Sequence, residues 1–175
     1  MVLAAGVVPL LRRMRDDLER TGRLRRGTQL GIWTAYAAFG ALVTDSIVRH
    51  RHEISVGQRT TGYVVAACGA ALAGAGMASF VGPEQLNGGE TGDLITSGIY
   101  AYSRHPQYAG FIVATAGLAT ARSSRRAAML ATELAVVLRV WTSIEEAHLQ
   151  RQFGAAYERL CSRVPRWIGV PSSEG

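Results

Sequence analysis

The chain has 175 residues, of which 48% are hydrophobic and only 18% are charged, so it has room for one domain and is apolar for a water-soluble protein. Its net charge of +6 comes from arginine alone, because all 19 basic residues are arginine. These arginines flank apolar stretches instead of alternating with aromatic residues, which argues against nucleic acid as a partner. An arginine bias without lysine is also typical of a GC-rich coding sequence and favours a bacterial source.

The N-terminal segment, residues 1–27, joins an apolar run to a strongly basic one. The apolar run has no arginine before it and no clear small-residue cleavage site after it, so we expect it to stay in the mature chain. The basic run continues to Arg26. The pattern predicts either an amphipathic helix at the membrane interface or a fifth, partly inserted element.

Four apolar stretches follow and predict an all-α, polytopic membrane protein of four to five transmembrane helices. Their bounds are Thr28–Val48, Thr60–Gly82, Tyr108–Ala121 and Ala127–Ile144. The second carries no charge and is long enough to cross a hydrocarbon core of about 30 Å, whereas the third is marginal. A buried, water-soluble helical bundle is the alternative. We expect residues 28–82 to form two spans.

Small residues in the second stretch recur at helical spacing, which suits close helix packing in lipid. They form two sets, Gly69, Ala73 and Gly76 in one and Ala70 and Gly74 in the other. The third and fourth stretches are separated only by RSSRR, Arg122–Arg126. We therefore expect them to form a tight helical hairpin.

The distribution of arginines in the short loops predicts the orientation. More arginines lie on the side of Arg12–Arg26 than on the side of Arg49 and Arg122–Arg126, so we place the former in the cytoplasm. The polar segments 83–104 and 145–175 then fall on that same side and can meet. For a bacterial source, this predicts an inner (plasma) membrane protein with its site facing the cytoplasm.

The first motif that carries chemistry is YSRHPQYAG, Tyr102–Gly110. Pro106 suits the first turn of a helix, which places His105 at the helix cap, where free backbone N–H groups favour an anion or a polar ligand. Arg104, Tyr100 and Tyr108 lie nearby. The motif is also consistent with an aromatic belt at the membrane surface, with the arginine reaching the headgroups.

The second motif is the acid pair Glu145-Glu146, directly after an apolar stretch. On a continuous helix, Glu145 shares one face with Leu149 and Gln152, while Glu146 lies about 100° away. One acid can therefore face a pocket and the other an arginine. A solvated helix start is the alternative.

Other ionisable residues give weaker signals. Arg139 and Glu133 lie within an apolar helix, where such groups are functional candidates, although Arg139 can also extend to the membrane surface. His50, His52 and Glu53 form an HxHE cluster. A third ligand and a suitable geometry are missing, so no metal site is expected. The chain has no GxGxxG or P-loop motif, which argues against a soluble nucleotide-binding fold.

Together, GIYAYSRHPQYAG at 98–110 and EEAHLQRQFGAAYERLCSRVPRW at 145–167 resemble the isoprenylcysteine carboxyl methyltransferase family, within a wider group that includes phospholipid methyltransferases. The resemblance covers residues 94–167. It implies an integral membrane enzyme that uses S-adenosylmethionine without a Rossmann domain. It also implies that the C-terminal hairpin and the following tail form the cofactor pocket.

The resemblance also implies roles for residues of this chain. The cofactor-binding candidates are Gly98, Tyr100, Arg104, His105, Pro106, Tyr108, Glu145, Glu146, Tyr157 and Arg163, with Pro165 in the closing tail. Glu146, Arg139 and His105 are the catalytic candidates, and His105 is the expected base if the acceptor is neutral.

The expected function is S-adenosylmethionine-dependent O-, S- or N-methylation of a lipophilic small molecule or lipid, with S-adenosylhomocysteine as product and carboxyl methylation as one form. Two alternatives remain open. One is a membrane reductase of the sterol-reductase type that uses NADPH, and the other is a non-catalytic membrane scaffold.

Overall fold

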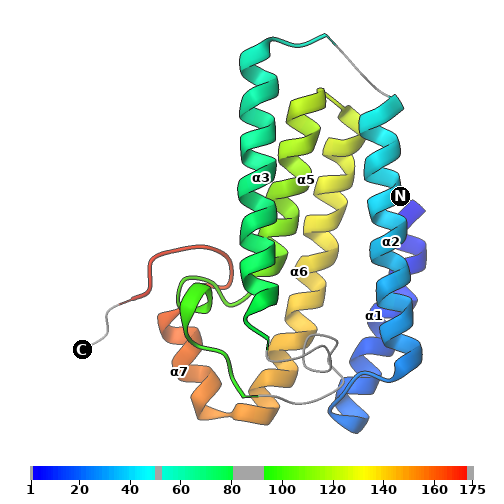
Figure 1. The fold of residues 1–175 in the computed structure, drawn as a ribbon. Coiled ribbons are helices and arrows are strands. Elements are labelled where there is room, and N and C mark those ends of the chain that lie inside the picture. The colour runs from blue at the N-terminus through cyan, green and yellow to red at the C-terminus, as the bar shows by residue number, and fades with distance from the viewer. Residues whose placement is uncertain (1, 50–52, 81–92, 173–175) are drawn as a thin grey trace.

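The computed structural model describes residues 2–49, 53–80 and 93–172, and these residues form helices and no β-strand. The elements are α1 (Val2–Thr21), α2 (Arg26–Arg49), α3 (Val56–Ala78), the short 3-10 helix η1 (Gly98–Ala101), α5 (Pro106–Arg122), α6 (Arg125–Phe153) and α7 (Ala155–Arg163) (Figure 1). The predicted all-α, polytopic class is confirmed. His50 and His52 lie outside the described residues.

Among the described residues, α2, α3 and α6 are long and apolar enough to cross a membrane. They correspond to three of the four predicted stretches. The fourth is α5, whose 17 residues extend about 26 Å at 1.5 Å per residue. Helix α6 has 29 residues and runs beyond the predicted Ile144 to Phe153, so the acid pair lies inside a helix.

Helices α3 and α5 pack side by side with their backbones in close approach (Figure 1). A Cβ atom built on Gly69 would lie 2.3 Å from the backbone nitrogen of Ala114, and one on Gly110 would lie 2.4 Å from that of Ala73. Only glycine permits this approach. The predicted packing role of Gly69, Ala73 and Gly76 agrees with this interface.

The second small-residue set does not pack, contrary to the prediction. Ala70 and Gly74 are exposed, and no atom of the described residues lies within 4 Å of a Cβ built on Gly74. The interface instead continues along the first face to Ala66 and Gly62. A single helix face can meet only one partner, and α5 occupies the face of Gly69.

The hairpin between α5 and α6 is as tight as predicted. Ser123 ends α5 in a left-handed conformation with φ of 47°, and Ser124 caps α6 by accepting a hydrogen bond from the backbone N–H of Ala127. The Ser124 hydroxyl also donates to the carbonyl of Ser46 in α2. The turn therefore joins three helices at one end of the bundle.

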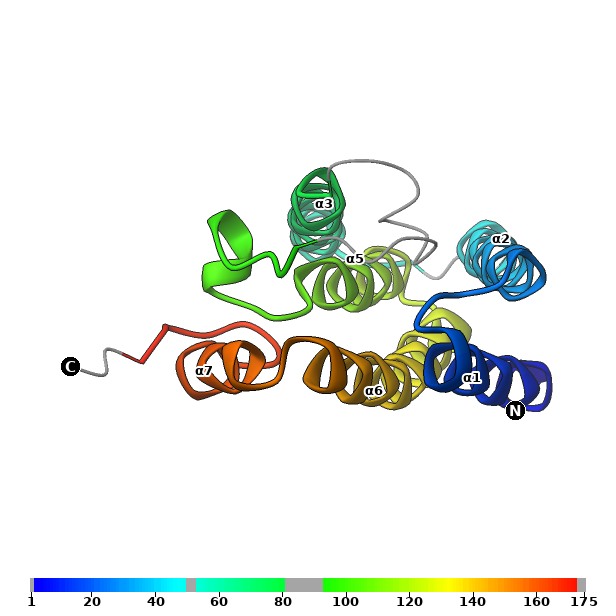
Figure 2. The ribbon, with the colours of Figure 1, turned by 90° about the horizontal axis from the view of Figure 1, so that it is seen from below.

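Helix α1 belongs to the bundle and lies alongside the lower halves of α2 and α6 (Figure 1). Its buried residues Met14 and Leu18 share a hydrophobic core with Leu138 and Trp141 of α6. From below, α7, α6 and α1 lie in one row, with α5 against α6 and α3 behind α5 (Figure 2). Helix α1 is therefore part of the helical bundle, and its position relative to the membrane stays a prediction.

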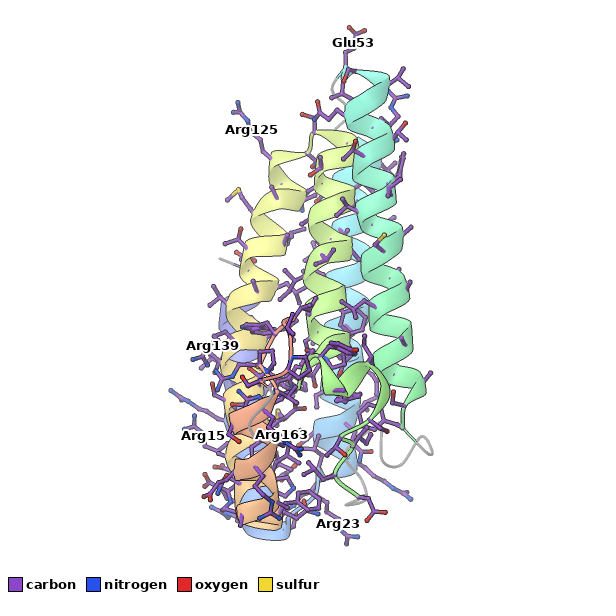
Figure 3. All side chains as sticks on the ribbon, turned by 90° about the vertical axis from the view of Figure 1, so that its left-hand side faces the viewer. Arg15, Arg23, Glu53, Arg125, Arg139 and Arg163 are labelled. Atoms are coloured by element: carbon purple, nitrogen blue, oxygen red, sulfur yellow. The ribbon has the colours of Figure 1, made fainter. Side chains whose placement is uncertain are left out.

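The two ends of the bundle differ in the residues that they carry. Arg15, Arg23 and Arg163 lie at the lower end, whereas Arg125 and Glu53 lie at the upper end (Figure 3). Helix α5 begins in the lower half of the bundle, and α6 ends at the lower end (Figure 1). The two predicted motifs therefore meet in the half of the bundle that also carries the N-terminal arginines Arg15 and Arg23.

Candidate active site

A cavity of about 640 Å³ lies among α1, α2, α5, α6, α7 and the segment before η1. Polar side chains from the two sequence motifs lie in its lower part together with apolar ones such as Leu149 and Phe153, and apolar side chains of α2, α5 and α6 line its upper part. The motifs are far apart in sequence but share one cavity because α5 and α6 form an antiparallel hairpin.

The start of α5 positions His105. Pro106 occupies the first helical turn, His105 is the cap residue, and the Ser103 hydroxyl accepts a hydrogen bond from the His105 backbone N–H at 3.1 Å. The imidazole is only 3% exposed and stacks on the ring of Tyr108, with 5.7 Å between the ring centroids. The predicted cap position of His105 is thus confirmed.

Glu145 faces the cavity and is held by two neutral donors. Its Oε1 accepts hydrogen bonds from the Tyr108 hydroxyl and from the Trp141 indole N–H, each at 2.7 Å. Its Oε2 lies 3.7 Å from Nδ1 of His105. No arginine pairs with this carboxyl group among the described residues, and the residue lines the cavity.

Glu146 points to a different side and is surrounded by two arginines and His105. Arg166 donates to both of its carboxylate oxygens, Arg104 lies 3.4 Å away, and Nε2 of His105 lies 3.2 Å from Oε1. Glu146 is not among the residues that line the cavity. The predicted division, one acid facing a pocket and the other an arginine, is present in the structure.

The C-terminal tail holds this arrangement together. The backbone N–H of Arg104 donates to the carbonyl of Pro165 at 3.0 Å, and that of Gly169 donates to the carbonyl of Tyr102 at 3.1 Å. The Ser103 hydroxyl lies 3.4 Å from the carbonyl of Arg166. The tail therefore runs beside residues 102–104, and this position brings Arg166 to Glu146.

Two cavity-lining residues each bury a polar atom that has no well-formed hydrogen bond among the described residues, namely Nε of Arg104 and the hydroxyl of Tyr157, which lies beside the Cys161 thiol. Arg104 donates through Nη1 to Cys161 and leaves Nε unused. Tyr157 is only 3% exposed. Burial raises the pKa of its phenol above the ordinary value, and the nearby Glu146 carboxylate raises it further. The phenol therefore remains a neutral donor at physiological pH.

Tyr100 connects the cavity to α3. Its hydroxyl donates to Oε1 of Gln107 at 2.8 Å and lies 3.4 Å from the carbonyl of Gly76. Burial, and secondarily the charge of Glu145, raises the pKa of this phenol. The ring also meets Phe80 edge to face.

The structure brings most, but not all, of the predicted site residues together. Those that line the cavity are Tyr100, Arg104, His105, Tyr108, Glu145 and Tyr157. Pro106 is buried at the start of α5, and Gly98 is exposed with φ of +62°. Arg139 and Arg163 are also exposed, and neither lines the cavity. Arg139 projects outward from α6 (Figure 3), and its Nη1 donates to Ser143.

Three residues of the site were not predicted from the sequence. Trp141 lies one helical turn before Glu145 and so could have been placed on the same face. Arg166 follows Pro165 in the same motif as Arg163, but only a structure shows which arginine turns inward. Tyr36, from α2, carries no local signal because its role depends on packing against Trp141.

Comparison with known proteins identifies the family of this fold and site. The model of the phospholipid methyltransferase family matches residues 58–156, from the start of α3 to the start of α7. The chain belongs to the phospholipid methyltransferase family. The matched region includes both the RHP segment and the acid pair, which confirms the resemblance seen in the sequence.

The chain is similar to the protein-S-isoprenylcysteine O-methyltransferase of Schizosaccharomyces pombe, with 37% identity over 84 residues. The match covers 45% of this chain and 33% of the relative, so it spans about a third of that protein's length. No solved structure matches the chain. Family membership and the three spanning helices agree with a methyltransferase held in a membrane.

Proposed function

We propose that this protein transfers a methyl group from S-adenosylmethionine to a lipophilic acceptor at the membrane. The observation that carries the proposal is the polar end of the cavity, where Glu145 lies in one wall and Arg104, His105 and Tyr157 lie in the others. These side chains come from both sequence motifs, and together they offer an acid, a guanidinium, an imidazole and a phenol to one bound molecule.

The side chains at this end fit the groups of S-adenosylmethionine. The molecule carries a sulfonium and an ammonium cation, a carboxylate and an adenine ring. Glu145 balances positive charge, and the rings of Tyr108 and Trp141 beside it attract cations through their faces. Arg104 and Tyr157 can donate to the carboxylate. Both signs of charge on the cofactor thus have a partner in this cavity.

Once bound, S-adenosylmethionine would supply an electrophilic methyl group for in-line displacement. The contribution of the protein is then mainly alignment, and orientation of this kind lowers a barrier by several kcal/mol. The hydrogen bonds from Tyr108 and Trp141 fix the Glu145 carboxylate in one position. The apolar upper part of the cavity excludes water, which strengthens electrostatic interactions at the polar end.

His105 is the candidate base for an acceptor that must lose a proton. Its imidazole lines the cavity and is oriented by Glu146, a relationship typical of a base and its supporting acid. A carboxylate or thiolate acceptor would need no base. We therefore propose Glu145, Arg104, Tyr157, Tyr108 and His105 as the binding and catalytic set, with Glu146 as a positioning residue.

The geometry supports no cofactor contact for Arg139 or Arg163, because both are exposed. We further propose that the site faces the cytoplasm and, for a bacterial source, lies in the inner membrane. This orientation is supported by the position of the site at the end of the bundle that carries Arg15 and Arg23 (Figure 3).

Calorimetry of the detergent-solubilised protein with S-adenosylhomocysteine tests the proposal. We expect saturable binding of S-adenosylhomocysteine and none of NADPH, which separates methyl transfer from the reductase alternative. His105→Ala should weaken binding or abolish turnover while the protein remains folded. The absence of binding at millimolar S-adenosylhomocysteine would overturn the proposal and leave the scaffold alternative.

A further inference from the structure

The upper part of the cavity has an aromatic wall on α2. This α2 wall consists of Trp33, Tyr36 and Phe39, and Phe111 and Leu118 of α5 line the same cavity. Trp33 is 48% exposed although its neighbours are partly buried. The wall is thus accessible from outside the bundle, on the apolar surface of a spanning helix.

The α2 wall is continuous with the polar end of the cavity through a series of tilted ring contacts. Tyr36 lies 6.1 Å from Trp33, 5.9 Å from Phe111 and 6.3 Å from Trp141, measured between ring centroids. Trp141 in turn donates to Glu145. A molecule that lies along this wall therefore reaches the carboxylate at its inner end.

The charges around the cavity restrict what such a molecule can carry. Arg104 is the only arginine among the described lining residues, and it already contacts Glu146 and Cys161. The remaining charged lining residues are the acids Asp93 and Glu145. The stretch 81–92 cannot supply a cation either, because its sequence contains no basic residue.

Apart from Arg104 and the histidines His105 and His148, a phosphodiester would therefore meet no basic group among the described residues that line this cavity, and it would meet two acids. Burying an unpaired anion costs several kcal/mol, and two nearby carboxylates add repulsion. If Arg104 binds the carboxylate of the cofactor, no guanidinium remains for a phosphate. Burial of an uncharged, ring-bearing molecule involves no such desolvation or repulsion. Its ring can also make edge-to-face or offset contacts with Tyr36 and Phe111.

We infer that the methyl acceptor is an uncharged, ring-bearing lipophile without a phosphate group, and that the α2 wall holds its apolar body. This inference rests on the proposed function. For a phenolic acceptor, a lone pair of the hydroxyl oxygen forms the new bond to the methyl carbon as the carbon–sulfur bond breaks. That bonding pair stays on sulfur, giving S-adenosylhomocysteine, and the hydroxyl proton passes to His105 and then to water.

The test compares two probes on the same detergent-solubilised protein saturated with S-adenosylhomocysteine. The probes are 4-decylphenol, which is uncharged, and a short-chain phosphatidylethanolamine, which carries a phosphodiester. We expect calorimetry to detect binding of 4-decylphenol at least tenfold tighter than that of the phospholipid. With S-adenosylmethionine, tritium from its methyl group should appear in the alkylphenol product.

Matched variants locate the binding surface. Trp33→Leu should weaken 4-decylphenol about tenfold and leave the affinity for S-adenosylhomocysteine unchanged. The control is Tyr63→Leu, which changes an exposed aromatic residue of α3 that does not line the cavity and should have no effect on either ligand. Equal effects of the two variants would argue against the α2 wall.

Failure of the inference is distinguishable from failure of the proposed function. If S-adenosylhomocysteine does not bind, the proposed function is wrong and the acceptor inference falls with it. If S-adenosylhomocysteine binds but 4-decylphenol does not, or if the phospholipid binds more tightly, only the acceptor inference is overturned.

Discussion

Glu146 on α6 accepts hydrogen bonds through both carboxylate oxygens from Arg166, which lies 20 residues later in the C-terminal tail. The same carboxylate holds His105 and lies 3.4 Å from Arg104. One acid thus connects three segments that meet at the cavity. Its environment explains why Glu146 lies behind the cavity wall while Glu145 faces the cavity.

Removal of the inward-facing arginine should loosen the tail. We expect Arg166→Ala to weaken S-adenosylhomocysteine binding about tenfold, because Arg104 and His105 lose the support of the tail and of a fixed Glu146. Calorimetry measures the change. Arg163→Ala is the matched control, since Arg163 is exposed and only three residues away. Equal losses in both variants would show that the pairing of Arg166 does not position the site.

Neutralising Glu146 should cost stability as well as binding. Glu146→Gln leaves Arg104 and Arg166 without their shared carboxylate, and loss of one partner of a partly buried ion pair costs roughly 1–3 kcal/mol. Thermal unfolding in detergent should therefore show a clear decrease in melting temperature. Glu158→Gln, on the surface of α7, should have little effect because exposed polar pairs contribute little. An unchanged melting temperature for Glu146→Gln would contradict this account.

The role proposed for Glu145 predicts a change in ligand preference. Glu145→Gln keeps an oxygen that accepts from Tyr108 and Trp141 but removes the negative charge. S-adenosylmethionine carries the sulfonium charge and S-adenosylhomocysteine does not. We expect the variant to lose about tenfold more affinity for S-adenosylmethionine, which corresponds to about 1.4 kcal/mol. Parallel titrations measure both, and equal losses would remove Glu145 from contact with the sulfonium.

The close contact of α3 and α5 predicts different effects for two glycines of one helix. Gly69→Ala places a methyl group against the backbone of Ala114 and should destabilise the protein by about 1–3 kcal/mol. Gly74→Ala faces open space and should be neutral or slightly stabilising. Unfolding curves of the two variants measure the two changes in the free energy of unfolding. The interface would be misplaced if Gly74→Ala were the more harmful change.

The raised pKa of Tyr157 predicts an alkaline dependence of stability. The unfolded chain loses its phenolic proton near the ordinary pKa of about 10, whereas burial raises the pKa of this phenol in the folded protein. The folded state therefore holds more protons above pH 10, and stability falls as pH rises. Tyr157→Phe should show a shallower loss above pH 10 than the wild type in thermal unfolding. If the melting temperature fell equally with pH in the wild type and in Tyr157→Phe, Tyr157 would not be the group that causes the alkaline loss of stability.

Much of the fold follows from periodicity and from local turn chemistry. Pro106 after His105 predicts the start of α5, and the short RSSRR segment predicts the hairpin. The different surroundings of Glu145 and Glu146 follow from the rotation of 100° between consecutive helical residues. These features depend on neighbouring residues, so the sequence is sufficient to predict them.

Features that depend on packing partners were not predictable in the same way. The small residues Ala70 and Gly74 have the same spacing as the packed set but face outward, because only one face of α3 meets α5. Arg163 and Arg166 stand in one motif, and the path of the tail decides which of them meets Glu146. Tyr36 enters the site only because α2 approaches α6.

The tail contacts also have a consequence for biosynthesis. Chain segments leave the ribosome in order, so the spanning helices can insert before residues 165 and 166 have emerged. Until then, Glu146 has no Arg166 and the backbone N–H of Arg104 has no carbonyl from Pro165. A nascent or prematurely terminated chain that ends before Pro165 would insert into the membrane without the tail contacts that complete the site. Competence to bind is thus acquired late in translation, after insertion.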